Sequence, residues 1–372
     1  MRLLIAPDKF KGSLSALAAA QAIERGFRTV FPDLVADLAP IADGGEGFSE
    51  SLGGALGAEW VTVKTEDAIG RPLEARYAWV AAEQLAILEM SAASGLCHFQ
   101  LAERNPLAAT TYGTGLLMRD AIARGAKKIL VGLGGSATTD GGAGLAQALG
   151  YRFLNEAGGE FVPHPGTLDL LDRIEAPTDL RLPEIIAACD VQNPLLGERG
   201  TARVYSPQKG ADAPTMELLE SAMRRLADVA AESLRWDARD VPGAGAAGGL
   251  GYGLLTFCQA TIRPGFDIVA ETMRLDERLA AADLVITGEG RLDDQTLDGK
   301  GPAGVAARAR LAGKPVIAFG GAVNPAAEQA GIFDALVPLT DRPMALEEAM
   351  ASAALLLERA ATRAAKLLAM RV

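Results

Sequence analysis

Five polar, glycine-rich segments hold the residue types that could carry out chemistry, and the longest covers residues 132–144. It contains six glycines, three hydroxyl side chains and one carboxylate. Glycines let backbone N–H groups approach an anion, and hydroxyl groups add donors, which is how a phosphate-binding loop is built. The segment therefore favours phosphate or nucleotide binding over a plain structural loop. Its candidate nucleotide- or phosphate-binding residues are Gly134, Gly135, Ser136, Thr138, Thr139 and Asp140.

Two glycine motifs bear on which nucleotide could bind. The Walker A pattern GxxxxGK[ST] is absent from the whole sequence. Gly132, Gly134 and Ala137 match G-x-G-x-x-A behind a predicted strand, so a dinucleotide site stays open, although the predicted helix starts later than that fingerprint requires. A second match at residues 243–248 has no clear strand before it and indicates a flexible or tightly packed loop.

Two segments near the N-terminus combine charge with glycine. Lys9 and Lys11 precede a predicted helix, where backbone N–H groups and a lysine suit an anion, so we assign both to catalysis. Asp43 and Glu46 lie in a glycine-rich turn and are candidate substrate-binding residues, because carboxylates hold Mg²⁺ or a hydroxyl. The alternatives are solvated lysines at an ordinary helix start and a tight turn without a ligand.

The segment 287–300 has a density of charge that is unusual for a structural loop. Glu289 and Asp293 are predicted to bind Mg²⁺, which prefers oxygen ligands and needs only one or two carboxylates. Arg291 is a candidate catalytic residue, and Lys300 is a candidate substrate-binding residue.

The remaining segment follows a predicted strand at residues 184–189. Asp190 is the candidate base, or the group that orients an attacking hydroxyl. Asn193, in the same segment, and Lys209, in a nearby stretch, are candidate substrate-binding residues. A turn without a function is the alternative.

The elements that must position these segments predict an α/β protein of two domains. Strands and helices alternate at both ends of the chain, which predicts a Rossmann-like, mostly parallel, doubly wound sheet. Between them, consecutive strands at 60–64, 76–80 and 85–90 predict antiparallel pairing and a second, mixed α/β domain inserted into the first. The expected domains are 1–58 plus 266–372, and 59–265.

Composition excludes several classes of protein. The 372 residues are 49% hydrophobic and 22% charged, which excludes a disordered chain. Three scattered cysteines and two histidines argue against a disulfide scaffold and a zinc site. A net charge of −11 argues against a nucleic-acid partner, and no apolar run reaches the length of a membrane span. We expect a cytoplasmic monomer or homodimer with a small-molecule substrate.

Taken together, the segments supply carboxylates, lysines and phosphate-binding backbone. Phosphoryl transfer needs positioning, Mg²⁺ and positive charge more than a covalent nucleophile, so this inventory suits it better than hydride or acyl transfer. We expect the active site in the cleft between the domains, where loops from both would meet and closure would exclude water.

Several long strings in the sequence resemble the bacterial glycerate kinase family of the glycerate 2-kinase type. They include APDKFKGSLSA (6–16), PIADGGEGF (40–48), GLGGSATTDGGAGLAQALG (132–150), CDVQNPLLG (189–197) and ITGEGRLDDQTLDGKGPAGVA (286–306), and the resemblance covers essentially the full chain. It implies transfer of phosphate from ATP to D-glycerate with Mg²⁺, by a Rossmann-like domain with a second domain inserted in it.

The position of phosphorylation follows from the resemblance and not from residue spacing. Characterised bacterial members of the family lean to 2-phosphoglycerate, which is the expected product, and 3-phosphorylation by the same site is the alternative. From a different class, a nucleotide-binding oxidoreductase would use the G-x-G-x-x-A loop, and a regulator would bind glycerate without turnover.

Overall fold

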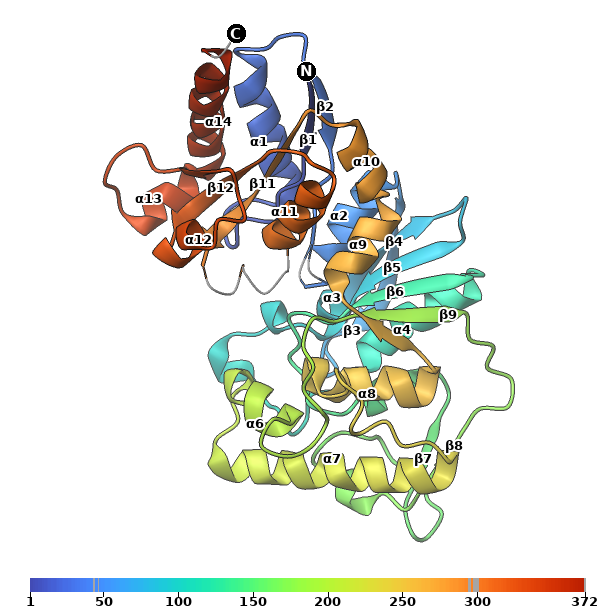
Figure 1. Cartoon of the computed structure of the whole chain (residues 1–372). Coiled ribbons are helices and arrows are strands. Elements are labelled where there is room, and N and C mark those ends of the chain that lie inside the picture. The colour runs from blue at the N-terminus through green and yellow to red at the C-terminus, as the bar shows by residue number, and fades with distance from the viewer. Residues whose placement is uncertain (43, 46, 294–295, 297–300, 371–372) are drawn as a thin grey trace. The chain divides into compact units, whose positions relative to one another are not determined.

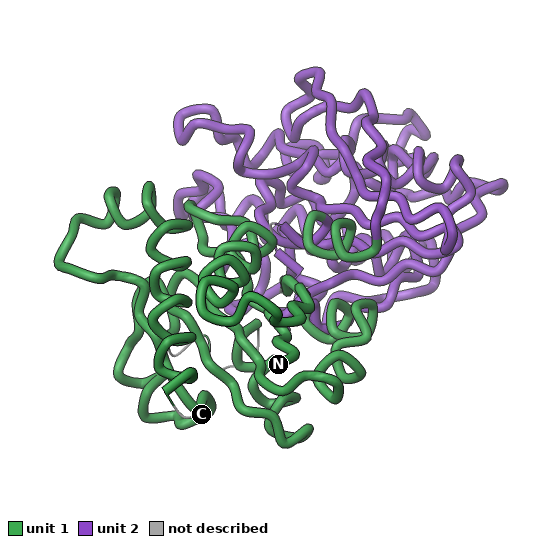
Figure 2. The backbone as a smooth tube through the Cα atoms, turned by 90° about the horizontal axis from the view of Figure 1, so that it is seen from above, with its two compact units in different colours: residues 1–43, 50–56, 266–372 green, residues 44–49, 57–265 purple. Residues whose placement is uncertain are grey.

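The computed structural model describes residues 1–42, 44–45, 47–293, 296 and 301–370, and they form two compact units (Figure 2). Unit 1 comprises residues 1–43, 50–56 and 266–372, and unit 2 comprises 44–49 and 57–265. Residues 44–49 thus cluster with unit 2, whereas the expected boundaries place them in the first domain. Contacts with strand ends of unit 2, described below, account for this difference.

Unit 1 is built on a five-stranded sheet in the order β13-β12-β11-β1-β2, and every neighbouring pair is parallel. The chain moves outward from β1 to β2 on one side and returns at β11 on the other side of β1. The strand order therefore reverses between β1 and β11, which is the switch point where open α/β sheets bind ligands. The strands are β1 (Arg2–Ile5), β2 (Val35–Leu38), β11 (Leu284–Leu292), β12 (Val316–Val323) and β13 (Ala335–Pro338).

Helices cover both faces of this sheet. On one face α1 and α14 lie side by side (Figure 1), and Gly26 permits their close approach, since a Cβ there would lie 2.4 Å from the carbonyl oxygen of Glu358. α10 and α11 contact strands β1, β11 and β12. The helices are α1 (Ala16–Arg28), α2 (Phe48–Ala55), α9 (Gly265–Thr272), α10 (Leu275–Ala281), α11 (Gly301–Leu311), α12 (Pro325–Gln329), α13 (Leu346–Ala351) and α14 (Ala353–Ala369).

Unit 2 is built on a mixed sheet of six strands in the order β10-β9-β6-β5-β4-β3. β5, β6, β9 and β10 run parallel, and β3 and β4 join antiparallel through a hairpin. A separate antiparallel pair, β7–β8, completes the strands. Their bounds are β3 (Glu59–Glu66), β4 (Pro72–Val80), β5 (Leu85–Glu89), β6 (Lys128–Gly132), β7 (Arg152–Leu154), β8 (Arg173–Glu175), β9 (Glu184–Ala188) and β10 (Thr261–Arg263).

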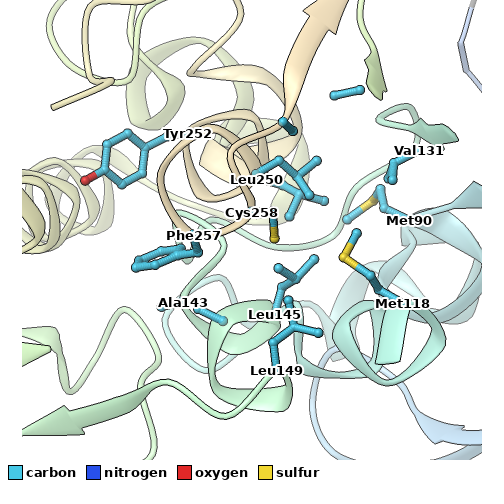
Figure 3. Packing of buried hydrophobic residues seen from close by; sticks show 14 of the residues in the cluster. Met90, Met118, Val131, Ala143, Leu145, Leu149, Leu250, Tyr252, Phe257 and Cys258 are labelled. Atoms are coloured by element: carbon cyan, nitrogen blue, oxygen red, sulfur yellow. The ribbon is translucent and has the colours of Figure 1, made fainter. Parts of the chain in front are cut away.

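The core of unit 2 is packed from small and medium side chains. Figure 3 shows Met90 and Met118 beside Val131, with Leu145 and Leu250 close by. The low aromatic content, 5% of the sequence, fits this packing of small residues. The helices are α3 (Ser91–Ser94), α4 (Tyr112–Ala123), α5 (Ala143–Ala148), α6 (Thr201–Tyr205), α7 (Ala213–Leu234) and α8 (Ala246–Cys258).

The predicted fold class is confirmed: one sheet is parallel, the other is mixed, and helices accompany both. Antiparallel pairing of the strands predicted at 60–64, 76–80 and 85–90 is also confirmed. Among the helices that the described residues form, none is long and apolar enough to cross a membrane.

One expected loop is instead a strand. β11 runs on through Leu292, so Glu289 and Arg291 lie on a strand that pairs with Gly320 and Ala322 of β12. Glycines allow this extension, since a Cβ on Gly288 would lie 2.3 Å from the carbonyl oxygen of Phe319.

Candidate active site

In unit 1 the segment after β1 and the far end of β11 lie together at the switch point. The N–H of Asp8 donates to the carbonyl oxygen of Gly288 at 2.8 Å. A Cβ on Gly290 would lie 3.2 Å from the backbone nitrogen of Lys11, so the backbones of these two segments are in close contact. The segment that carries Lys9 and Lys11 and the strand that carries Glu289 and Arg291 are therefore neighbours in one region of unit 1.

The charged side chains of this region are tied to one another. Arg291 Nε lies 3.0 Å from Asp293 Oδ2, and the guanidinium side chain is 67% exposed. Thr296 Oγ1 donates to Glu289 Oε1 at 2.6 Å and accepts from the N–H of Asp293 at 3.0 Å. Glu289, Asp293 and Arg291 are thus held in one cluster at the carboxyl end of β11.

Two carboxylates in one cluster fit Mg²⁺, which takes oxygen ligands and keeps several waters. Within the described part of the chain, no group of three or more His, Cys, Asp or Glu side chains is arranged to hold a metal. The donor set of Glu289 and Asp293 therefore suits a partly hydrated Mg²⁺ better than a fully enclosed metal.

Asp8 belongs to this region although the sequence analysis does not single it out. It is buried, its Oδ1 accepts from the N–H of Lys9 at 2.6 Å, and its Oδ2 would lie 3.1 Å from a Cβ on Gly301 at the start of α11. Its position directly before Lys9 in the first glycine-rich segment is the signal that could have identified it.

In unit 2 three segments meet at the carboxyl ends of β5, β6 and β9. The N–H of Gly134 donates to the carbonyl oxygen of Gly44 at 3.4 Å. A Cβ on Gly44 would lie 3.0 Å from Ala188, the last residue of β9. Segments 44–49 and 132–136 and the start of the Asp190 segment consequently share one edge of the mixed sheet.

The segment 132–144 has two halves with different exposure. Gly135 is exposed and Gly134 is half-buried, whereas Ser136 is buried. Two backbone hydrogen bonds hold the exposed turn: the N–H of Leu96 donates to Gly135 O at 2.8 Å, and the N–H of Ala137 donates to Ser94 O at 2.9 Å. The turn at 134–135 is therefore the part of the segment whose backbone is accessible.

The second half of the segment faces the interior. Thr138, Thr139 and Asp140 are fully buried. Asp140 accepts hydrogen bonds from the N–H and hydroxyl of Thr111, both at 2.8 Å, and from the N–H groups of Gly142 at 3.2 Å and Gly144 at 3.0 Å. A ligand at the surface of unit 2 does not reach these side chains in this conformation.

Asp140 therefore joins the starts of two helices, α4 through Thr111 and α5 through Gly142 and Gly144. Burial raises the pKa of this carboxyl, and the hydrogen bonds that it accepts oppose the rise. The carboxylate fixes the path of the loop from inside.

Lys209 and Asn193 are engaged within the protein. Lys209 is 1% exposed and its Nζ donates to the carbonyl oxygen of Thr138 at 2.5 Å, while burial lowers its pKa to about 7. Asn193 Nδ2 donates to Arg199 O at 2.7 Å, and its Oδ1 accepts from the hydroxyl of Tyr205 at 2.8 Å.

The observed bonds of Lys209 and Asn193 are internal to the protein, and their substrate-binding role stays a prediction. Lys209 holds the buried half of the 132–144 segment through its bond to the Thr138 carbonyl. The amide of Asn193 has two internal partners and keeps one N–H donor and one lone pair beyond these two bonds.

The glycine-rich stretch 243–253 packs tightly against the same loop. A Cβ on Gly248 would lie 1.7 Å from Thr138 O, and one on Gly253 would lie 2.6 Å from the Cα of Gly142. Residues 247–249 have positive φ values inside α8, which explains glycine at two of these three positions. The glycines of the second G-x-G-x-x-G match therefore allow close packing of the backbone.

Asp190 is half-buried and follows β9 directly. Its Oδ1 accepts from the N–H of Gly265, the first residue of α9, at 3.0 Å. Asp43, Glu46 and Lys300, which the sequence analysis assigns to substrate binding, lie outside the described residues.

A cavity of about 370 Å³ in unit 1 lies at the start of β1, at the opposite end of that strand from the charged cluster. Arg2, Arg274 and Arg278 line it, but they pair with Asp37 and Glu277. We assign no ligand to this cavity.

Comparison with known proteins places the chain in a family. Residues 3–369 match the model of the glycerate kinase family. The chain is 45% identical over 367 residues to a glycerate kinase of Bacillus subtilis, covering 97% of this chain and 96% of that protein. It is 43% identical over 331 residues to a glycerate 2-kinase of Escherichia coli, covering 87% and 86% of the two chains.

A solved structure supports the same assignment. The crystal structure of a protein from Salmonella typhimurium LT2, described as a candidate glycerate kinase 2, matches with a TM-score of 0.90 and 42% identity, over 100% of this chain and 98% of that one. The resemblance seen in the sequence is confirmed, and the chain is an enzyme of the kinase class. It belongs to the glycerate kinase family.

Proposed function

We propose that this enzyme transfers a phosphoryl group from ATP to the C2 hydroxyl of D-glycerate, with Mg²⁺ as cofactor. The observation that carries the proposal is the meeting of residues 6–11 with the end of β11 at the switch point of unit 1. The segments that meet there carry two lysines and two carboxylates suited to Mg²⁺, and this is the place where open α/β sheets bind ligands. The name of the Escherichia coli relative, glycerate 2-kinase, supports the C2 position.

We assign the charged residues of unit 1 two roles, binding of anionic groups and binding of Mg²⁺. Lys9, Lys11 and Arg291 supply positive charge to the transferring phosphoryl group or to the carboxylate of glycerate. Glu289 and Asp293 hold Mg²⁺, which when bound neutralises charge on the phosphate oxygens. No covalent intermediate with the protein is required.

Unit 2 contributes backbone groups and one carboxylate. The exposed turn at Gly134 and Gly135 offers main chain to the nucleotide phosphates. Asp190 orients the attacking hydroxyl, and orientation matters more than basicity because a loose phosphoryl-transfer transition state needs little early deprotonation. We propose that loops of both units act on the same bound ATP and D-glycerate.

The decisive experiment is phosphorus NMR of the product formed from D-glycerate, ATP and Mg²⁺. We expect ADP and 2-phosphoglycerate in equal amounts. A 3-phosphoglycerate signal would leave the kinase in place and reverse the regiochemistry. Absence of any phosphoglycerate would overturn the proposal, and reduction or oxidation of glycerate with NAD(H) would favour the oxidoreductase.

The roles of the carboxylates are separated by two variants. Asp190→Asn is expected to lower kcat strongly and to leave ATP binding nearly intact. Glu289→Gln is expected to raise the Mg²⁺ concentration needed for half-maximal rate about tenfold, in the range for lost metal-site contacts. If Asp190→Asn changes only the Mg²⁺ requirement, the two assignments must be exchanged.

A further inference from the structure

Thr296 places a buried hydroxyl group between the two carboxylate residues at the end of β11. Only 5% of the residue is exposed. Its Oγ1 donates to Glu289 Oε1 at 2.6 Å, and the same atom accepts from the N–H of Asp293 at 3.0 Å. The N–H of Thr296 in turn donates to the carbonyl oxygen of Asp293 at 3.1 Å. The sequence analysis assigns Thr296 no role, and these bonds link it to both candidate metal ligands.

The hydroxyl group of Thr296 has a single hydrogen, and the geometry assigns that hydrogen to Glu289. The carbonyl oxygen of Arg291 lies 3.4 Å from Oγ1, which is longer than the usual O–H···O distance of about 2.5–3.0 Å. The N–H of Asp293 can only donate, so it takes a lone pair of the hydroxyl oxygen and leaves the hydrogen for the carboxylate. When Glu289 is ionised, as a metal ligand must be, the bond at 2.6 Å is of the strong, charge-assisted kind.

This bond limits the conformations of the Glu289 side chain. Glu289 is half-buried on β11, and fixing a long, rotatable side chain when a ligand binds costs conformational entropy. With one oxygen held by Thr296, the carboxylate is oriented before a cation arrives. It can still ligate the cation, because an ionised carboxylate has about four lone-pair sites and Thr296 uses one of them.

Thr296 also fixes the second carboxylate residue, through its backbone. The two hydrogen bonds between Thr296 and the main chain of Asp293 set the position from which the Asp293 side chain extends. One threonine thereby ties the side chain at position 289 to the backbone at position 293. Removing a partner that orients metal ligands typically weakens metal binding by about 10- to 100-fold.

We propose that Thr296 is a positioning residue for the Mg²⁺ of the reaction, which acts by orienting the carboxylate of Glu289. The inference rests on the proposed function, in which Glu289 and Asp293 hold Mg²⁺. Loss of the Thr296 hydroxyl should therefore weaken metal binding to the protein itself, before any substrate is bound.

A purely structural role makes a different prediction. If Thr296 only stabilised unit 1, valine in its place would lower the melting temperature and leave the metal affinity of the folded protein unchanged. Direct measurement of metal affinity, beside the melting temperature, therefore separates positioning from stability.

The test measures Mn²⁺ binding to the full-length protein by electron paramagnetic resonance, without nucleotide or turnover. Mn²⁺ is the probe because it takes the same oxygen ligands as Mg²⁺. We expect Thr296→Val, which lacks only the hydroxyl, to raise the Kd for Mn²⁺ about tenfold. Thr296→Ser restores the hydroxyl and should stay within about threefold of the wild type.

Thr362→Val is the matched control in unit 1. The hydroxyl of Thr362 donates to the carbonyl oxygen of Glu358 at 2.9 Å, within the same helix α14. This variant also loses a threonine hydroxyl, but no carboxylate depends on it in that bond. It should bind Mn²⁺ as the wild type does.

A double-mutant cycle tests whether Thr296 acts through Glu289. Glu289→Gln alone should weaken Mn²⁺ binding about tenfold. If the hydroxyl acts by orienting that carboxylate, adding Thr296→Val to Glu289→Gln should weaken binding by less than about threefold more. Independent effects would multiply to about 100-fold, and that result would overturn the inference.

Each other outcome has a defined meaning. Wild-type Mn²⁺ affinity in folded Thr296→Val, or equal weakening in Thr362→Val, overturns the inference and leaves phosphoryl transfer in place. If Thr296→Val does not fold, Thr296→Ala takes its place, and failure of both to fold shows a structural role instead. A wild type that binds no Mn²⁺ refutes the metal ligands and the inference together. A wild type that binds Mn²⁺ and does not phosphorylate glycerate refutes the proposed function alone.

Discussion

The carboxyl edges of the two sheets use charge in opposite ways. In unit 1 two charged side chains at the end of β11, Arg291 and Asp293, pair with each other, and the guanidinium of Arg291 stays exposed. In unit 2 the charged side chains turn inward and bond to backbone, as Glu89, Asp140 and Lys209 do. The accessible part of the 132–144 segment in unit 2 is the glycine turn at Gly134 and Gly135, which carries no side chain.

The difference shows that a charged residue in a glycine-rich segment has two distinct uses. A side chain that interacts with a ligand must stay accessible, and its neutralisation should affect activity. A buried charge can fix glycine backbone that has high conformational entropy, and its neutralisation should first affect stability. Variants in the two regions can sharpen or break this comparison.

The largest expected effect is on the stability of unit 2. Asp140→Ala leaves four donors without their acceptor in a buried site, so the free energy of unfolding should fall by about 3 kcal/mol or more. Denaturant unfolding followed by circular dichroism measures this loss. Asp179→Asn, at an exposed position, is the control. Wild-type stability combined with lost ATP binding would show that Asp140 faces a ligand after all.

The next effect is on activity and comes from unit 1. Lys9→Ala should reduce kcat/KM by about 30- to 900-fold, equivalent to about 2–4 kcal/mol of transition-state stabilisation, as when other preorganised electrostatic contacts are lost. Its melting temperature should stay close to that of the wild type. Lys366→Ala, exposed on α14, should change neither quantity. An unchanged kcat/KM in Lys9→Ala removes Lys9 from the mechanism.

The smallest effect is a pH dependence of stability in unit 2. Because burial lowers the pKa of Lys209 from 10.5 to about 7, the unfolded chain binds one more proton than the folded chain between these values. The wild type should therefore gain about 2 kcal/mol of unfolding free energy between pH 7 and pH 9 from this group.

Lys209→Met lacks this titration. Its unfolding free energy should therefore fall progressively below that of the wild type as the pH rises from 7 to 9, measured by denaturant unfolding at several pH values. Curves that stay parallel for the two proteins would mean that Lys209 keeps an ordinary pKa and is accessible to water.

Local patterns were sufficient for most of the elements. The apolar run at Lys128–Gly132 is predicted and found as a strand with the same bounds, because its side chains are buried on a central strand of the sheet. The extension of β11 through Leu292 was not predicted, because glycines and charges are typical of loops. Its pairing depends on the equally glycine-rich end of β12, which is a partner in space.

The sequence by itself determined the family and the fold class, since these follow from long motifs and from hydrophobic periodicity. Only the tertiary structure decided which charged side chains stay accessible and which are buried and bonded to the backbone. The partners that decide it lie far away in the chain: Glu89 meets Ser49, Asp140 meets Thr111, and Lys209 meets Thr138. Burial and hydrogen bonding depend on such contacts, and residue type and local spacing do not encode them.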